Sequence, residues 1–393
     1  MKRSLNIFFV ALKLGLISFG GPVAHIGYFR DMYVRRLGWI DDATFAKLVA
    51  LCQILPGPAS SQVGMAIGAL HGGFLGGLVA WIGFTLPSAL ALIFFGFAID
   101  TFNLQDTGWL VGLKIAAAAV VANALWGMSR SLTPDRTRIT IAIIAAILLL
   151  YERTTVTQIT ILLAGAAIGW KLQLSSVSVF APSHTPYWKL NKTIAAGSIV
   201  LFFLLLIVLP ILREFHTSQY ISLFDSFYRA GSLVFGGGHV VLPLLESEVV
   251  TSGWLSKDEF IAGYGAAQAI PGPLFTFAAY IGTVANIEPN GLTGAFIALF
   301  AIYLPSFLLL AAILPFWQQF TMGRRLEAAY AGMSAAVIGL LVAAFYNPVW
   351  TYAITTTSHF SLWLLATTLL MVWKVPPWLV VLLTALGGYA LEL

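Results

Sequence analysis

The sequence contains very few charged residues. Lys and Arg number 21 and Asp and Glu number 16, so 9% of the 393 residues are charged, whereas about 25% is usual in a soluble globular domain. A soluble protein of this length needs charged groups to cover its surface, and this chain does not have them. The composition therefore excludes a soluble enzyme, a disordered chain and a nucleic-acid-binding protein.

Cysteine and metal-ligand patterns are also scarce. Cys52 is the single cysteine, which excludes a disulfide within the chain. Cysteine and histidine do not occur together at the spacings of a metal site. The sequence implies no metal and no cofactor.

Long apolar runs make up most of the chain. Hydrophobic residues account for 59% of the sequence. A helix needs about 20 apolar residues to cross a bilayer, so the chain has room for about twelve or thirteen membrane segments. The sequence therefore predicts an all-α polytopic membrane protein in contact with the lipid bilayer.

The first half of the sequence recurs in the second half. Glycine, proline, glutamine and tryptophan positions return in the same order at offsets of 215 to 218 residues. The equivalent motifs are Phe19-Gly20-Gly21-Pro22 and Phe235-Gly236-Gly237-Gly238, Gln53 and Gln268, Pro56-Gly57-Pro58 and Pro271-Gly272-Pro273, and Leu86-Pro87-Ser88 and Leu304-Pro305-Ser306. We therefore predict two repeats, at residues 1–171 and 216–393, with a polar linker and a joining transmembrane helix at 172–215.

The charges of equivalent loops predict opposite orientations for the two repeats. Loop 29–47 contains Arg30, Arg35, Arg36 and Lys47, whereas its counterpart 243–260 contains one lysine and four acidic residues. Positive loops mark the cytoplasmic side, so we expect inverted topology, a cytoplasmic N-terminus and a C-terminus outside. All the basic loops lie on the cytoplasmic side of the membrane if the first two segments of each repeat are re-entrant helices broken at Gly and Pro. Inverted repeats are typical of secondary transporters.

The broken segments predict a binding site for an anion. Irregular backbone at membrane depth is tolerated where protein or a polar cavity satisfies it, and paired breaks indicate a midplane site. Pro22 and Pro58 stand where a new helix would begin, and such a helix start presents free N–H groups and partial positive charge. We expect no acidic residue in the apolar parts of these segments, which leaves a cation without ligands.

Two basic residues fall inside apolar segments at equivalent positions. Lys13 lies in the first segment, and an offset of 216 places Arg229 opposite it. A charge near the bilayer centre costs about 3 kcal/mol. We interpret the pair as cations facing the anion. The alternative is that both side chains extend to the membrane interface.

Several polar residues flank the breaks. His25 and His239 could donate to an anion, relay a proton or serve only in packing, and the buried amides Gln53 and Gln268 need hydrogen-bond partners. Ser18 and Gln62 are weaker candidates. The predicted substrate site comprises Lys13, Ser18, Gly20, Gly21, Pro22, His25, Gln53, Pro56, Gly57, Pro58, Gln62, Arg229, Gly236, Gly237, Gly238, His239, Gln268, Pro271, Gly272 and Pro273.

These motifs together resemble the chromate ion transporter family in its long-chain, two-domain form. The resemblance rests on Ser18-Phe19-Gly20-Gly21-Pro22 with His25, on Gly38-Trp39 and on Gln53-Ile54-Leu55-Pro56-Gly57-Pro58, and it spans essentially the whole chain. It implies an inner-membrane protein that exports chromate, driven by the proton gradient, with sulfate as competitor, and that confers chromate resistance. The halves differ where Gly238 stands opposite Pro22 and Phe277 opposite Gln62.

Two other functions use similar chemistry. An uncoupled anion channel would also employ helix termini and basic residues, and the sequence does not separate it from a transporter. A membrane-embedded enzyme or carrier for phosphate-bearing lipid would need a nucleophile or metal site, and the membrane segments contain no such pattern. We therefore expect a transporter rather than an enzyme.

Overall fold

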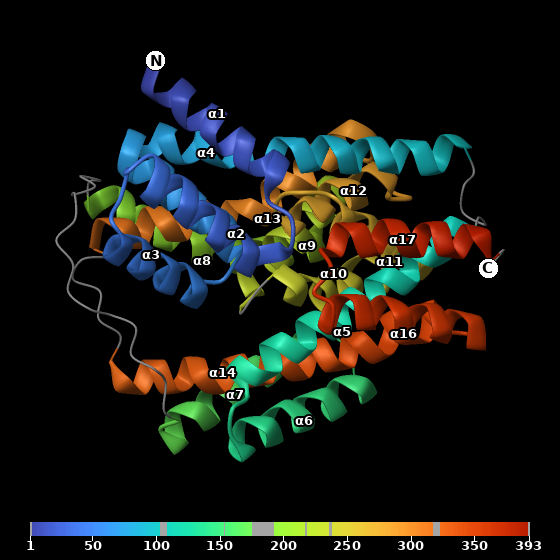
Figure 1. Ribbon diagram of the computed structural model, residues 1–393. Helices are drawn as coiled ribbons and strands as arrows, with labels where there is room; N and C mark the ends of the chain where they lie inside the picture. Colours follow the sequence, from blue (N-terminus) through green and yellow to red (C-terminus); the bar gives the residue numbers. More distant parts are fainter. Residues whose placement is uncertain are drawn as a thin grey trace. The chain divides into compact units, whose positions relative to one another are not determined.

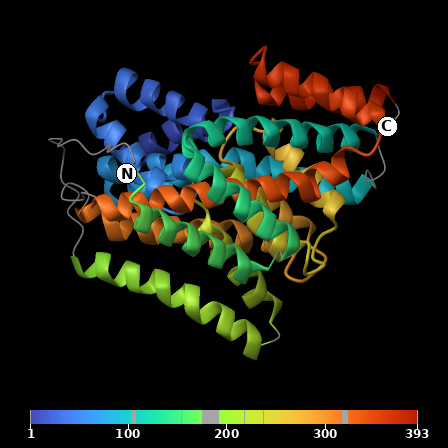
Figure 2. The same ribbon diagram turned by 90° about the horizontal axis from the view of Figure 1, so that it is seen from below.

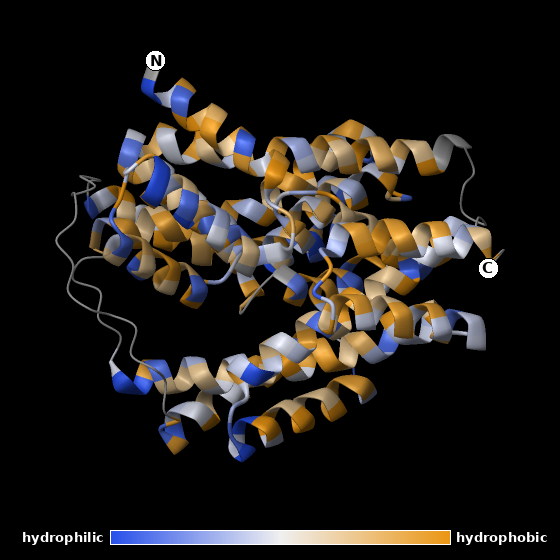
Figure 3. Ribbon diagram, in the orientation of Figure 1, coloured by the Kyte–Doolittle hydropathy of each residue, from blue (hydrophilic) through white to orange (hydrophobic). Residues whose placement is uncertain are grey.

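The computed structural model describes residues 2–102, 108–152, 154–174, 192–216, 218–235, 238–316 and 323–391. All regular elements in these residues are helices (Figure 1). Within the same residues, five helices are long and apolar enough to cross a membrane. Figure 3 shows hydrophobic residues along most helices, α6 (Arg136–Tyr151) and α17 (Pro377–Ala390) among them. The prediction of an all-α polytopic membrane protein is confirmed.

The chain folds into two compact units, each assembled from three stretches of sequence. The first unit contains residues 1–94, 178–238 and 271–321, and the second contains residues 95–177, 239–270 and 322–393. Each unit therefore takes stretches from both predicted repeats. The repeat boundaries themselves stay a prediction.

The first unit contains the Gly- and Pro-broken segments of the first half and parts of those of the second half, because residues 239–270 belong to the second unit. Its elements are α1 (Lys2–Ile17), α2 (Gly21–Phe29), the π-helix η1 (Arg30–Arg36), α3 (Asp42–Ile54), α4 (Ala59–Phe102) up to Phe94, α8 (Lys192–Phe215), α9 (Gln219–Leu233), η4 (Leu274–Thr276), α12 (Phe277–Val284), α13 (Gly291–Ile313) and η5 (Leu314–Phe316). Figure 2 shows α8 in yellow-green as one long continuous helix.

The breaks occur where the sequence predicts them. Gly20 adopts a φ of 95° between α1 and α2, a conformation that glycine reaches without steric cost. Pro22 then lies in the first turn of α2, where its fixed φ suits a helix start. Pro56-Gly57-Pro58 separates α3 from α4, because proline cannot continue a helix that needs its N–H group.

Helices of the first unit pack closely at glycines in equivalent positions of the two halves. A Cβ on Gly15 in α1 would lie 2.6 Å from the Phe84 carbonyl oxygen in α4, and one on Gly231 in α9 would overlap the Ile302 carbonyl oxygen in α13. Small residues permit this backbone contact between membrane helices. The same packing therefore recurs at positions 216 to 218 residues apart.

The second unit is a bundle of the remaining helices. Its elements are α4 from Phe95 onward, α5 (Gly108–Leu132), α6, α7 (Thr155–Leu172), η3 (Gly238–Val240) from His239 onward, α10 (Val241–Val249), α11 (Lys257–Ala269), α14 (Arg324–Ala344), the π-helix η6 (Phe345–Trp350), α15 (Thr351–Ala353), α16 (Thr357–Met371) and α17. Glycines again permit close helix contacts, Gly112 in α5 with Gly388 in α17 and Gly169 in α7 with Gly332 in α14.

The interpretation of residues 243–260 as a charged loop is wrong in its first part. Residues 241–249 form the buried helix α10, in which Glu246 and Glu248 are 8% and 6% exposed. The apolar side chains of Val241 and Leu245 are fully buried, so burial of this face carries the two carboxylates inward. These carboxylates are therefore not loop charges, and the orientation of the termini stays a prediction.

Candidate functional site

Two backbone hydrogen bonds tie the broken segments of the two halves together in the first unit. The Gly57 N–H donates to the Val234 carbonyl oxygen at 2.8 Å, and the Gly272 N–H donates to the Ser18 carbonyl oxygen at 2.9 Å. Gly57 corresponds to Gly272 and Ser18 to Val234 by the repeat offset. Each Pro-Gly-Pro turn of one half is thus bonded to the residue that follows the first broken helix of the other half.

The two turn glycines sit in tight polar surroundings. Their φ angles are 118° at Gly57 and 114° at Gly272. A Cβ on Gly57 would lie 2.5 Å from Ser306 Oγ, and a Cβ on Gly272 would lie 2.7 Å from Ser88 Oγ. Ser88 and Ser306 are also equivalent by offset, so the two turns have matching neighbours.

His25 joins the two broken segments of the first half. Its Nδ1 lies 3.2 Å from Ser60 Oγ in the first turn of α4, and its Nε2 lies 3.1 Å from the Ser18 carbonyl oxygen. The ring is 1% exposed. No side chain caps the start of α2, and the contact of His25 with Ser60 brings α2 to the first turn of α4, where the helix N-terminus carries partial positive charge.

Polar atoms around these helix starts are only partly hydrogen-bonded. Gln62 Nε2 donates to the Pro56 carbonyl oxygen at 2.7 Å and to Ser306 Oγ at 3.1 Å. Within the described residues, Gln62 Oε1 and the Ser18 hydroxyl are buried without a hydrogen-bond partner. Buried polar groups normally have partners, so this cluster retains unused hydrogen-bonding capacity, including one hydroxyl donor.

The two basic residues have different surroundings. Lys13 is exposed on α1, on the same side as the exposed Phe9 and Leu16. Arg229 in α9 forms an ion pair with Asp225. The exposed position of Lys13 fits the alternative interpretation, in which the side chain extends to the membrane interface.

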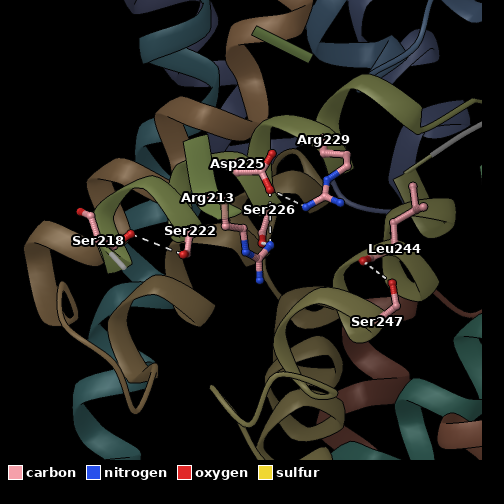
Figure 4. Close-up of polar contacts among 8 residues, drawn as sticks. All are labelled: Arg213, Ser218, Ser222, Asp225, Ser226, Arg229, Leu244 and Ser247. Carbon is pink, nitrogen blue, oxygen red and sulfur yellow. Dashed lines mark hydrogen bonds and ion pairs between the residues drawn. The ribbon is translucent and has the colours of Figure 1, made fainter. Parts of the chain in front are cut away.

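The expectation that the broken segments lack acidic residues is wrong. Asp225 lies inside α9 and is 1% exposed, and its carboxylate contacts Arg229 at 2.5 Å and Arg213 at 3.3 Å (Figure 4). Two guanidinium groups offset the cost of burying this carboxylate. The acid is therefore held as part of a cluster with a net positive charge.

The other predicted residues divide between the two units. Gln53 is exposed and lines an open cavity of about 590 Å³ with Arg30 and Asp42, where the Arg30 guanidinium holds the pKa of the Asp42 carboxyl below its ordinary value. In the second unit, His239 Nδ1 lies 2.7 Å from the Tyr264 hydroxyl, and Gln268 Nε2 is buried without a partner among the described atoms.

The remaining candidates are backbone positions. Gly21, Pro22, Pro56 and Pro58 stand at the breaks of the first half, Pro271 and Pro273 flank Gly272, and Gly238 begins η3. Gly236 and Gly237 lie outside the described residues.

Sequence reasoning missed several polar partners. Ser88 and Ser306 belong to a motif that recurs in both halves, so its recurrence was a usable signal. Ser60 lies two residues after Pro58 and would have been found by considering the first turn of the new helix. Arg213 and Asp225 have no such signal, because they do not recur.

Comparison with known proteins gives relatives along most of the chain. The sequence model of the family described as Chromate transporter matches residues 5–170 and again residues 221–389. A chromate transport protein of Pseudomonas aeruginosa is 27% identical over 360 residues, covering 86% of this chain and 79% of the relative. A chromate transport protein of Cupriavidus metallidurans is 28% identical, covering 87% and 81%.

A more distant relative is an uncharacterized transporter of Methanocaldococcus jannaschii, 25% identical over 86% of this chain and 83% of its own length. No solved structure matches the chain. The relatives are transport proteins, which confirms the expectation of a multi-pass membrane transporter rather than an enzyme. The chain belongs to the chromate transporter family.

Proposed function

We propose that the chain is a secondary transporter that exports chromate from the cytoplasm across the inner membrane and so confers chromate resistance. Sulfate-like oxyanions would compete for the same site. The observation that carries this proposal is the match of both halves to the chromate transporter family, at the segments that contain the breaks. Relatives named as chromate transport proteins support chromate as the substrate.

The broken segments of the first unit are the proposed binding region. The helix starts at α2 and α4 supply N–H groups and partial positive charge for an oxyanion, and the contact between His25 and Ser60 keeps the two starts together. The buried hydroxyl of Ser18 is a further donor. Backbone donors of this kind suit a tetrahedral dianion because they carry no counter-charge that must be removed.

The proposed repeats account for the symmetry of these contacts. The paired bonds from Gly57 to Val234 and from Gly272 to Ser18 connect equivalent positions, which is the pattern expected if 1–171 and 216–393 are related by duplication. Inverted orientation would then place one half's turn against the other half's first helix. Rocking of the halves about these bonds would give alternating access.

Coupling to the proton gradient is a further part of the proposal. His25 is the candidate within the first unit, since its ring contacts both a helix-start hydroxyl and a break carbonyl. His239, bonded to Tyr264, is the candidate within the second unit. An uncoupler would abolish export by a coupled transporter and leave flux through an uncoupled channel to follow the anion gradient.

Chromate accumulation in cells tests the proposal. Cells that produce the protein should accumulate less chromate than matched cells without it, and excess sulfate should reduce the difference. The His25→Ala variant, expressed to the same level in the membrane, serves as a control with a damaged site. Equal accumulation with and without the protein would reject the proposed function.

A further inference from the structure

A groove runs between helices α6 and α7 of the second unit. Both helices pack along α14 but make little contact with each other. A Cβ on Gly339 of α14 would overlap the Ala142 carbonyl oxygen in α6, and one on Gly332 would overlap the Gly165 carbonyl oxygen in α7. Ala336 lies between these two glycines on α14 and lines the groove. Small residues therefore bring α14 close to both helices and leave the space between α6 and α7 open.

The groove has apolar walls and the size of a ligand-binding pocket. Its volume is about 390 Å³, within the range of about 300–1,000 Å³ that is usual for such pockets. Isoleucine and leucine side chains form most of its walls, and several of them are exposed, such as Ile144 at 52%. Contiguous exposed apolar surface marks contact with a membrane or a partner. The groove therefore matches an occupant that is itself a hydrocarbon chain.

The length of the groove distinguishes a lipid chain from the helix of a partner. Its lining residues on α6 begin at Thr137 and end at Leu148, which corresponds to about 16 Å along a helix. This length is about half of the hydrocarbon core of a bilayer, or the depth of one leaflet. A transmembrane helix of a partner would need about twice that length. The groove therefore fits one acyl chain from one leaflet.

One end of the groove has two exposed basic residues. Arg136 directly precedes the lining residue Thr137 at the start of α6, and Lys171 directly precedes the lining residue Leu172 in the last turn of α7. Because a short connection joins the two helices, the start of α6 and the end of α7 lie at the same end of the groove. Neither basic side chain forms an ion pair with another residue that the structure describes. Both are therefore placed to meet an anion at this end.

The surrounding residues place this end of the groove at the level of lipid head groups. The Arg325 guanidinium, at the start of α14, lies 5.9 Å from the centre of the Trp170 ring near the end of α7. Tryptophan is enriched at the membrane–water interface. Asp135 caps α6 and forms an ion pair with Arg138. Basic residues outnumber acidic ones at the start of α6, the end of α7 and the start of α14, so this level attracts anionic head groups.

We propose that the groove between α6 and α7 binds one acyl chain of an anionic phospholipid, and that Arg136 and Lys171 hold the phosphate of that lipid. Guanidinium N–H groups pair with phosphate oxygens, and the lysine ammonium adds a second positive charge. The N-terminus of α6 is already capped by Asp135, so the phosphate depends on these two side chains. A zwitterionic lipid offers the same acyl chain without net charge and should bind more weakly.

Native mass spectrometry of the purified protein tests the proposal with phosphatidylglycerol and phosphatidylcholine of identical acyl chains. The wild type should bind phosphatidylglycerol more tightly than phosphatidylcholine. Arg136→Gln and Lys171→Gln should each lower the affinity for phosphatidylglycerol by about fivefold, the effect of one basic residue at an anionic lipid surface, and should leave the affinity for phosphatidylcholine unchanged. Lys192→Gln removes an exposed lysine at the start of α8 in the first unit and should behave as wild type.

Filling the groove tests the position of the acyl chain. Ala164→Phe places a large side chain among the lining residues and should weaken the binding of both lipids. Leu163→Phe changes the neighbouring residue, which is 65% exposed and lies outside the groove, and should retain binding. A changed oligomeric state in Ala164→Phe with unchanged lipid binding would overturn the proposal and assign the groove to contact between copies of the chain.

Cross-linking of the wild type provides a measurement that does not depend on the folding of any variant. Phosphatidylglycerol with a photoreactive group on its acyl chain should attach to residues 137–148 and 161–172. Cross-links that do not include these residues, or equal affinities of the wild type for the two lipids, would overturn the proposal. Chromate does not enter these measurements, so their outcome is independent of the proposed function.

Discussion

The turn at Gly57 offers a sharp test of the structure, because an added methyl group has no room there. In Gly57→Ala the backbone must keep a φ of 118°, which costs a residue with a Cβ about 1–3 kcal/mol. The new Cβ would lie 2.5 Å from Ser306 Oγ and 2.7 Å from Gln62 Nε2. Moving these groups leaves buried polar atoms unpaired, which costs about 1–3 kcal/mol more.

The total loss of about 2–6 kcal/mol is a large part of the free energy of unfolding of a typical protein. Gly38→Ala is the matched control, since Gly38 also has a positive φ, of 61°, but no atom lies within 4 Å of its Cβ position. Gly38→Ala should therefore lower the free energy of unfolding by about 1–2 kcal/mol, through the backbone conformation alone. The double variant Gly57→Ala/Ser306→Ala should recover the part caused by the overlap with Ser306, while the overlap with Gln62 Nε2 remains.

Thermal unfolding in detergent measures the loss of stability, and chromate flux in proteoliposomes measures the effect on transport. Gly57→Ala should have a lower Tm and a lower flux than Gly38→Ala, and the double variant should fall between them. Gly272→Ala with Ser88→Ala repeats the test in the second half, where the Cβ would lie 2.7 Å from Ser88 Oγ. Equal Tm values for Gly57→Ala and Gly38→Ala would refute the tight turn.

Two further substitutions test the polar site. His25→Ala removes the contacts with Ser60 Oγ and the Ser18 carbonyl, so it should lower the free energy of unfolding by about 1–3 kcal/mol and also lower chromate flux. His25→Gln retains a donor and an acceptor, so its effects should be smaller. Equal Tm values for the two variants would argue against these hydrogen bonds. Arg229→Ala should lower chromate flux strongly, because it leaves the Asp225 carboxylate with one arginine fewer. Lys13→Ala should retain chromate flux, because Lys13 is exposed. A larger loss of flux in Lys13→Ala than in Arg229→Ala would instead support Lys13 as a site residue.

The positions of the breaks could be predicted from the sequence, because they depend on local backbone chemistry. A positive φ at Gly20 and proline at the start of α2 are properties of single residues, and both are visible as Gly and Pro motifs. The partners across the breaks could not be predicted in the same way. The bond from Gly57 to Val234 joins residues far apart in sequence, and its existence depends on how whole helices pack.

The expected pairing of Lys13 with Arg229 shows what a constant sequence offset between two repeats cannot predict. The offset places the two residues at equivalent positions, but Arg229 has an acidic partner one turn away and Lys13 has a phenylalanine, Phe9, at that position. Equivalent backbone positions therefore carry different electrostatics. Similarly, the charge pattern of residues 243–260 predicts that Glu246 lies in a loop, whereas the structure places it in the buried helix α10.

Chromate efflux from loaded proteoliposomes tests the central claim most directly. Vesicles that contain the purified protein should release chromate faster than protein-free vesicles, external sulfate should compete when it is present on the binding side, and Gly57→Ala should slow release more than Gly38→Ala. Release at the same rate with and without the wild-type protein would contradict the account.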